Sequence, residues 1–188
     1  MEITTSEAMT PTAARPAFRV TPIPADVLDR IRAAGHDDSG NPLVPITSET
    51  GGAPMRCCLE PAAPGDRLCL IAYRPFTRRG PYAETGPVFI HAEACAGYTS
   101  TGSYPPGYRD WPTMVFRPYH YDGAIAYDAI QLGDGSTAET VIAGLLADPA
   151  IEFIHARNVY AGCYMFCISR PLRNALLTRH TLLRPGRP

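Results

Sequence analysis

Three short stretches of the chain combine side chains that bind metals, carry protons or act as nucleophiles. They are Arg56-Cys57-Cys58, His91 with Cys95, and the group of His155, Arg157, Cys163 and Cys167. Thiolate and imidazole groups are the ligands that zinc prefers, and a cysteine beside a cation or a histidine is activated as a nucleophile. The residue types therefore point either to a metal site or to a thiol-based active site.

A metal site requires ligands that converge on one point. His91 and Cys95 share a face if residues 92–95 form a helical turn. Two cysteines four residues apart on a strand, as in the third stretch, lie about 13 Å apart and cannot both join one site. Adjacent cysteines on a strand point to opposite faces, so at most one of the first pair takes part. The zinc site that remains open consists of Cys58, His91, Cys95 and Cys163, and the competing interpretation is that the cysteines pack in an apolar core.

A thiol active site is the second interpretation of the same residues. If residues 55–59 form a strand, Arg56 and Cys58 share one face, and the guanidinium would favour the thiolate form of the cysteine. His91 would supply the base if its strand is a neighbour. Glu84 follows Tyr82 in a loop and would act as a general acid or base in a tyrosine-lined pocket.

The segment IEFIHAR alternates with strict period two, which places His155 and Arg157 on one face of a strand. If that face is buried, the two polar groups either line a polar cavity or have buried partners such as Glu84 or Asp128. A buried arginine that faces a cleft binds carboxylate or phosphate groups well. Arg56 and Arg157 are therefore candidate anion-binding residues, with Tyr82 beside them.

Composition excludes several other chemistries. All 17 basic residues of the 188 are arginine, so no lysine can hold pyridoxal phosphate or reach the phosphates of a P-loop nucleotide. The net charge of −1 argues against nucleic acid and membrane surfaces as partners, and no apolar run is long enough for a membrane span. Six cysteines without a secretion signal predict free thiols and a cytoplasmic location.

The elements that must position these side chains are short. Helices are expected over 24–34, 137–147 and 172–177, with one helical turn over 92–97. Strands are expected over 17–23, 55–59, 67–73, 87–91, 114–121, 124–132, 151–157 and 163–170. This order predicts a single α+β domain over residues 17–178, with a mainly antiparallel sheet, two or three short helices and long Pro/Gly-rich loops. Residues 1–16 read as a disordered tail and 179–188 as an Arg/Pro-rich tail.

One apparent motif carries no function. Gly133-x-Gly135-x-x-Ala138 fits the glycine pattern of a dinucleotide-binding turn. Too few residues follow it to complete a doubly wound sheet, and the carboxylate of Asp134 would repel a pyrophosphate. NAD is therefore not expected as a cofactor, and the segment is interpreted as a glycine turn followed by a capping box from Ser136 to Glu139.

Several of these pieces together resemble a known family. They are Arg56-x-Cys58-Leu59, Pro64-Gly65-Asp66, Tyr82-Ala83-Glu84-x-Gly86-Pro87-x-Phe89-x-His91-x-x-x-Cys95, Arg117 to Gly123, His155 to Asn158 and Gly162-Cys163-Tyr164. The chain is similar, over roughly residues 18–170, to domain-of-unknown-function family 1203, a group of small bacterial proteins. The resemblance implies candidate residues and no reaction. Asp66 stands where the pattern has glutamate, and we assign it no chemical role.

Three functional hypotheses follow. The first is a small-molecule enzyme or binding protein for an anionic ligand, in which Arg56 and Arg157 bind the anion, His91 and Glu84 transfer protons and Cys58 is the nucleophile or a ligand. The second is a non-catalytic, zinc-stabilised interaction module, and a homo-oligomer is compatible with either. The third is an aromatic binding surface on loop 98–112, formed by Tyr98, Tyr104, Tyr108 and Trp111.

Overall fold

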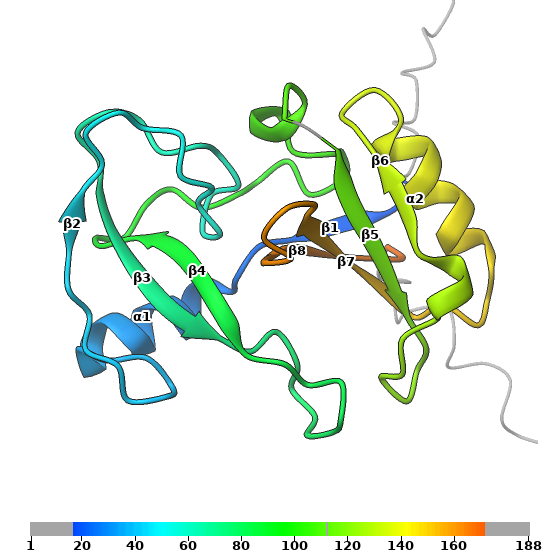
Figure 1. The fold of residues 1–188 in the computed structure, drawn as a ribbon, viewed down its shortest axis with the longest axis horizontal. Coiled ribbons are helices and arrows are strands. Elements are labelled where there is room, and N and C mark those ends of the chain that lie inside the picture. Colours follow the sequence, from blue (N-terminus) through cyan, green and yellow to red (C-terminus); the bar gives the residue numbers. More distant parts are fainter. Residues whose placement is uncertain (1–16, 112, 172–188) are drawn as a thin grey trace, which may run out of the picture.

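A computed structural model describes residues 17–111 and 113–171 of the chain, which form two antiparallel sheets and two α-helices (Figure 1). The larger sheet has the strand order β1-β8-β7-β5-β6, and the smaller has the order β2-β3-β4. The strands are β1 (Arg19–Thr21), β2 (Ile46–Thr47), β3 (Arg67–Tyr73), β4 (Gly86–His91), β5 (Met114–Tyr119), β6 (Gln131–Gly133), β7 (Phe153–Asn158) and β8 (Tyr164–Ser169). The expected α+β class with antiparallel strand pairing is confirmed, although the strands form two sheets rather than one.

The smaller sheet packs against α1 (Ala25–Ala34). Leu28 and Ile31 form the buried stripe of this helix and contact apolar side chains from β3 and β4. The helix ends at Gly35, whose φ of 71° is the left-handed conformation that glycine adopts at little cost. Helix and sheet enclose one of the two apolar cores of the molecule.

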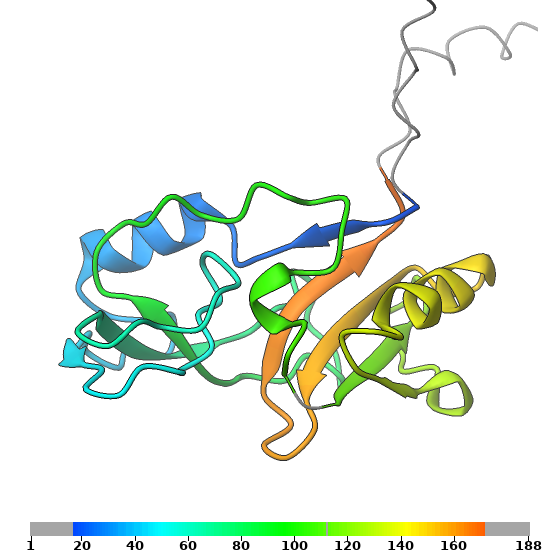
Figure 2. The same cartoon turned by 90° about the horizontal axis from the view of Figure 1, so that it is seen from above.

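The larger sheet packs against α2 (Ala138–Ala147), which covers one of its faces (Figure 2). Ile142 and Leu145 of the helix pack with Phe116 and Ile154 of the sheet in the second core. The helix begins where expected, but the predicted capping box does not form. Asp134 instead accepts hydrogen bonds from the N–H groups of Ser136 and Thr137, and Glu139 binds other partners. No helix in the part of the chain described here has the length and apolar character needed to cross a bilayer.

Three expected local structures are wrong. The strand expected over 124–132 is reduced to β6, because residues 127–129 form a short 3-10 helix. Residues 55–59 do not form a strand but a tight turn, in which the N–H of Leu59 bonds to the carbonyl of Met55. Residues 92–97 do not form a helical turn and run as an irregular segment away from β4. The helix expected over 172–177 lies outside the described residues, as do both expected tails.

The proposed aromatic surface on loop 98–112 is also wrong. Tyr104 and Tyr108 are fully buried in the core of the larger sheet, and Tyr98 and Trp111 pack against it. The Tyr108 hydroxyl donates a hydrogen bond to the Met55 carbonyl at 2.9 Å. The loop therefore serves as a packing segment that ties the larger core to the 55–60 turn.

Candidate metal centre and arginine cluster

The turn at residues 55–60 brings two adjacent cysteines to one side of the chain. Its backbone is held by the Arg56 N–H on the Phe89 carbonyl and by the Leu59 N–H on the Met55 carbonyl. Leu59 adopts a φ of 59°, a left-handed conformation that is uncommon for a residue other than glycine. Because the chain turns here rather than extending, Cys57 and Cys58 do not point to opposite faces.

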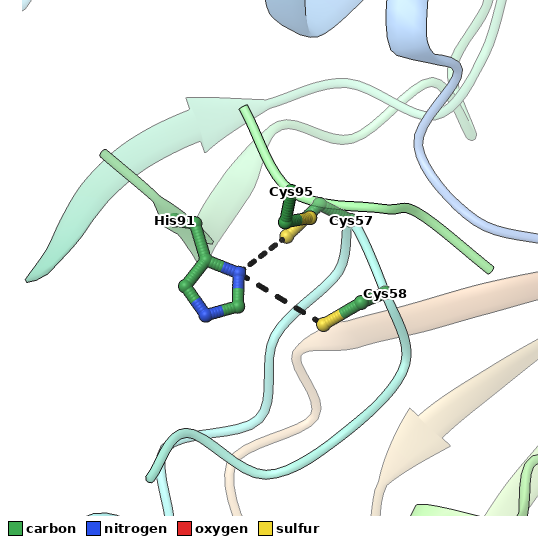
Figure 3. A group of neighbouring side chains, drawn as sticks. All are labelled: Cys57, Cys58, His91 and Cys95. Carbon is green, nitrogen blue, oxygen red and sulfur yellow. Dashed lines mark hydrogen bonds between the residues drawn. The ribbon is translucent and has the colours of Figure 1, made fainter. Parts of the chain in front are cut away.

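His91 and Cys95 come from β4 and the segment that follows it. His91 is the last residue of β4, paired in register with Leu68 of β3. The irregular segment after the strand returns Cys95 toward the 55–60 turn (Figure 3). The two residues converge through this return of the chain and not through a helical repeat.

Four side chains thus form one cluster, which we call the Cys/His cluster: Cys57, Cys58, His91 and Cys95. One ligand atom from each lies within 4.8 Å of every other. The Nδ1 atom of His91 is 3.3 Å from the Cys57 sulfur and 3.9 Å from the Cys58 sulfur. Zinc–ligand bonds of 2.0–2.3 Å in a tetrahedron place nitrogen and sulfur ligands about 3.6 Å apart and two sulfurs about 3.8 Å apart. The observed separations fit such a site.

Backbone N–H groups near the three sulfurs oppose the effect of burial on the pKa values of these thiols. They belong to His91 for Cys57, Glu60 for Cys58 and Gly97 for Cys95. Hydrogen bonds from backbone amides stabilise the negative charge of a thiolate, which is the form that binds metal. These amides favour the thiolate form at each position, although the pKa values of Cys57 and Cys95 remain raised.

The thiols influence one another. A hydrogen bond from Cys57 and the N–H of Glu60 lower the pKa of Cys58, although partial burial opposes them. The same bond to Cys58, together with burial, raises the pKa of Cys57 to about 12. Burial raises the pKa of Cys95. The cluster thus favours one thiolate at Cys58 and needs a further positive charge to hold more.

Asp66 orients the histidine of the cluster. Its Oδ2 lies 3.3 Å from Nε2 of His91 and accepts the Ala63 N–H at 2.7 Å. A carboxylate on the far nitrogen fixes the tautomer in which Nδ1 is free to bind a metal. Asp66, to which we assigned no chemical role, thus contacts the histidine of the cluster.

The ligand set differs from the predicted one by a single residue. Cys58, His91 and Cys95 are brought together as expected, and Cys57 takes the fourth position. Cys163 lies elsewhere, beside Arg157 and Glu84, on the walls of another cavity. The rule that adjacent cysteines cannot share a site fails here because it assumes a strand, and residues 55–59 form a turn.

Glu84 and Arg157 meet in a second group of polar side chains. Oε1 of Glu84 accepts hydrogen bonds from both Arg157 of β7 and Arg117 of β5. Arg157 also donates to the Gly162 carbonyl at 2.6 Å, and Arg117 donates to the Tyr119 hydroxyl at 2.7 Å. Glu84 pairs with Arg157 as expected, but its side chain is exposed rather than buried, and Glu84 is not a neighbour of His91.

Arg56 belongs to neither group. It is 2% exposed, and it donates to the carbonyls of Tyr164, at 2.8 Å, and Pro54. No carboxylate among residues 17–111 and 113–171 lies within ion-pair distance of it. Arg56 and Arg157 bond to different carbonyls of the 162–164 segment, and Arg56 does not line the cavity that Arg157 and Cys163 share.

Tyr82 lies apart from the Cys/His cluster and from the Glu84–Arg157 group. It belongs to a loop that lines a cavity of about 290 Å³. The cavity runs between residues 75–83, 121–123 and the sheet, where His155 and Cys167 line it. Tyr82 packs edge-on against Tyr127. The candidate residues that were expected to share one polar pocket therefore lie in separate sites.

Sequence reasoning missed three residues that these sites use: Cys57, Asp66 and Arg117. Arg117 lies opposite His155 in the β5–β7 register, so its side chain shares the face of His155 and Arg157. The alternation of Arg117 and Tyr119 within the predicted strand 114–121 carried this signal. No local signal pointed to Cys57, because its position depends on the turn.

Comparison with known proteins places the chain within a family but gives no activity. The family model described as "Protein of unknown function (DUF1203)" matches residues 52–170, which contain every residue of both groups above. No curated protein and no solved structure matches the chain.

Proposed function

The chain belongs to the DUF1203 family, and from its own site we propose that it is a zinc-binding protein whose single metal ion is held by Cys57, Cys58, His91 and Cys95. The observation that carries the proposal is the convergence of four ligand atoms within 4.8 Å, contributed by three separate segments. Three thiolates and one imidazole form a ligand set typical of zinc. The backbone N–H donors and the Asp66–His91 contact support the same assignment.

The proposed role of the metal is structural. Four protein ligands fill a tetrahedral zinc site and leave no position for water or substrate, whereas catalytic sites keep one open. The ligands join the 55–60 turn, the end of β4 and the 95–97 segment, which are elements without a long hydrogen-bond ladder between them. A zinc ion there would replace missing backbone contacts, which makes the protein a metal-stabilised module in the sense of the second hypothesis.

Metal analysis of freshly purified protein tests the proposal. We expect about one zinc per chain in the wild type, and a loss of most of it in Cys57→Ser and Cys95→Ser. Cys163→Ser is the matched control, because Cys163 lies outside the cluster and its variant should keep its zinc. Loss of zinc in Cys163→Ser together with its retention in Cys57→Ser would restore the ligand set expected from the sequence.

A protein without zinc would overturn the proposal and favour the thiol interpretation. In that case Cys58 should react with iodoacetamide faster than the other five cysteines, with His91 at 3.9 Å as its neighbour. Zinc-bound thiolates are instead protected, and all three cluster cysteines should become reactive only after chelation. Mass spectrometry of the alkylated peptides distinguishes the two patterns.

A reducing compartment is part of the proposal. All six cysteines are free thiols in the structure, and thiolate ligands keep their metal where disulfides do not form. We therefore propose a cytoplasmic location, which fractionation of cells that express the untagged protein would test.

A further inference from the structure

Two arginines on neighbouring strands converge on one carboxylate oxygen. Arg117 of β5 and Arg157 of β7 occupy one face of the larger sheet, and both donate to Oε1 of Glu84. The side chains of the arginines are 18% and 8% exposed, whereas that of Glu84 is 43% exposed. The cations are thus fixed in the sheet, and the anion reaches them from the outer loop at residues 74–85.

The charges of this group do not balance. Two guanidinium groups face one carboxylate, and Arg56, which bonds to the Tyr164 carbonyl, adds a third positive charge to this part of the molecule. His155, on the same sheet face, has its pKa held well below the ordinary value by burial and by the two arginines, so it stays neutral. Nε of Arg157 is buried and has no hydrogen-bond partner among the described residues. Buried cations without matching anions favour the binding of an external one.

A cavity of about 190 Å³ opens beside the pair. Glu84 and Arg157 line it, together with Cys163, Tyr73 and Tyr164. Its volume accommodates a molecule of a few non-hydrogen atoms. Arg117 does not line this cavity and meets the site through its bond to Glu84. The site shares no residue with the Cys/His cluster, so it is independent of the proposed zinc ion.

We propose that Arg117 and Arg157 form a binding site for a small dicarboxylate, and that Glu84 is an internal occupant which the ligand displaces. The carboxylate of Glu84 already shows which anion the two arginines accept, because planar guanidinium groups pair well with carboxylate oxygens. Displacement leaves two positive charges at the site, which a dicarboxylate matches. Without a ligand, the carboxylate of Glu84 occupies the site. A dicarboxylate competes with it for the two arginines.

Calorimetric titration of the full-length protein with succinate, at ionic strength matched by sodium chloride, tests the site. The wild type should bind weakly, because the tethered Glu84 competes at a high effective concentration. Glu84→Gln removes this competitor and should bind at least tenfold more tightly. Arg117→Gln, which keeps the Arg157–Glu84 pair, should lose binding by at least tenfold.

Asp38→Asn is the matched control, because Asp38 forms an exposed ion pair with Arg30 far along the chain, and its removal should leave succinate binding unchanged. If Glu84→Gln fails to fold, Glu84→Asp replaces it, since the shorter side chain competes less well for both arginines. Equal affinity in the Glu84 variant and the wild type overturns the displacement. Sulfate that binds as tightly as succinate, with the same dependence on Arg117, overturns the assignment to carboxylates.

Discussion

Leu59 adopts its left-handed backbone conformation although it carries a full side chain. Such a residue costs roughly 1 to 2 kcal/mol relative to an ordinary conformation. The side chain is fully buried in the core of the larger sheet, which offsets this cost. The conformation closes the turn that places Cys57 and Cys58 side by side. Strain of this kind persists where the surrounding contacts determine it, as they do at functional sites.

His155 allows a pH prediction for a single residue. It is 1% exposed among aromatic rings, and its Nδ1 has no hydrogen-bond partner among the described residues. Burial, with the charges of Arg157 and Arg117, holds its pKa well below the ordinary value of about 6.5. The unfolded chain therefore binds a proton below pH 6.5 that the folded protein does not, and stability falls as the pH drops from there. If the folded protein does not protonate His155 at all, the free energy of unfolding falls by about 2 kcal/mol between pH 7 and pH 5.

Urea denaturation of wild type and His155→Phe at both pH values measures this cost. The variant removes the titrating group, and the cavity beside residue 155 leaves room for the larger ring. Between pH 7 and pH 5, the free energy of unfolding of the variant should fall by about 2 kcal/mol less than that of the wild type. Both proteins share the remaining titratable groups and the Cys/His cluster, so their difference isolates His155. A parallel loss in His155→Phe and wild type would contradict the prediction.

At the scale of elements, Asp37 fastens a loop to a strand. Its carboxylate accepts the N–H groups of Ser39, at 2.9 Å, Asn41, at 3.0 Å, and Ala72 of β3, at 2.7 Å. These bonds lower the pKa of Asp37, although burial opposes them. The loop after α1 thereby connects directly to the smaller sheet.

Asp37→Ala should lower the free energy of unfolding by about 3 kcal/mol, because it leaves buried N–H donors without partners. Asp38→Ala is the matched control from the next position. The Asp38 side chain is 59% exposed and pairs with Arg30 on the surface, so its removal should cost less than about 1 kcal/mol. Chemical denaturation of the two variants checks the difference, and equal effects would show that the loop is held by other contacts.

The elements with a clear period were predictable, and those set by distant contacts were not. The sequence RLCLIAY and the alternation of IEFIHAR are local signals, and β3 and β7 lie where these signals placed them. The turn at residues 55–60 has no such signal. It depends on the Phe89 carbonyl and on the Tyr108 hydroxyl, both more than 30 residues away. Three of the four cluster residues were therefore predicted, whereas Cys57 required knowledge of the tertiary fold.

For the whole molecule, the location of the cluster predicts where the protein opens when the metal is removed. All four residues of the Cys/His cluster lie on the side of the smaller sheet, around the 55–60 turn and the end of β4. The larger sheet has its own core and its own ladder between β7 and β8. The two halves therefore depend on the cluster to different degrees.

Chelation of the zinc-loaded protein should lower its melting temperature by roughly 10 °C or more, since structural zinc contributes directly to folding free energy. Hydrogen exchange should then accelerate at the amides of Arg56, Leu59 and Ala92, whose bonds join the turn and β4 to their neighbours. Amides in β7 and β8 should keep their protection, because no ligand lies on those strands. Added zinc should restore slow exchange in the wild type and in Cys163→Ser but not in Cys95→Ser. A uniform loss of protection over both sheets would instead mean that the molecule unfolds as one unit, with the zinc ion supporting both cores equally.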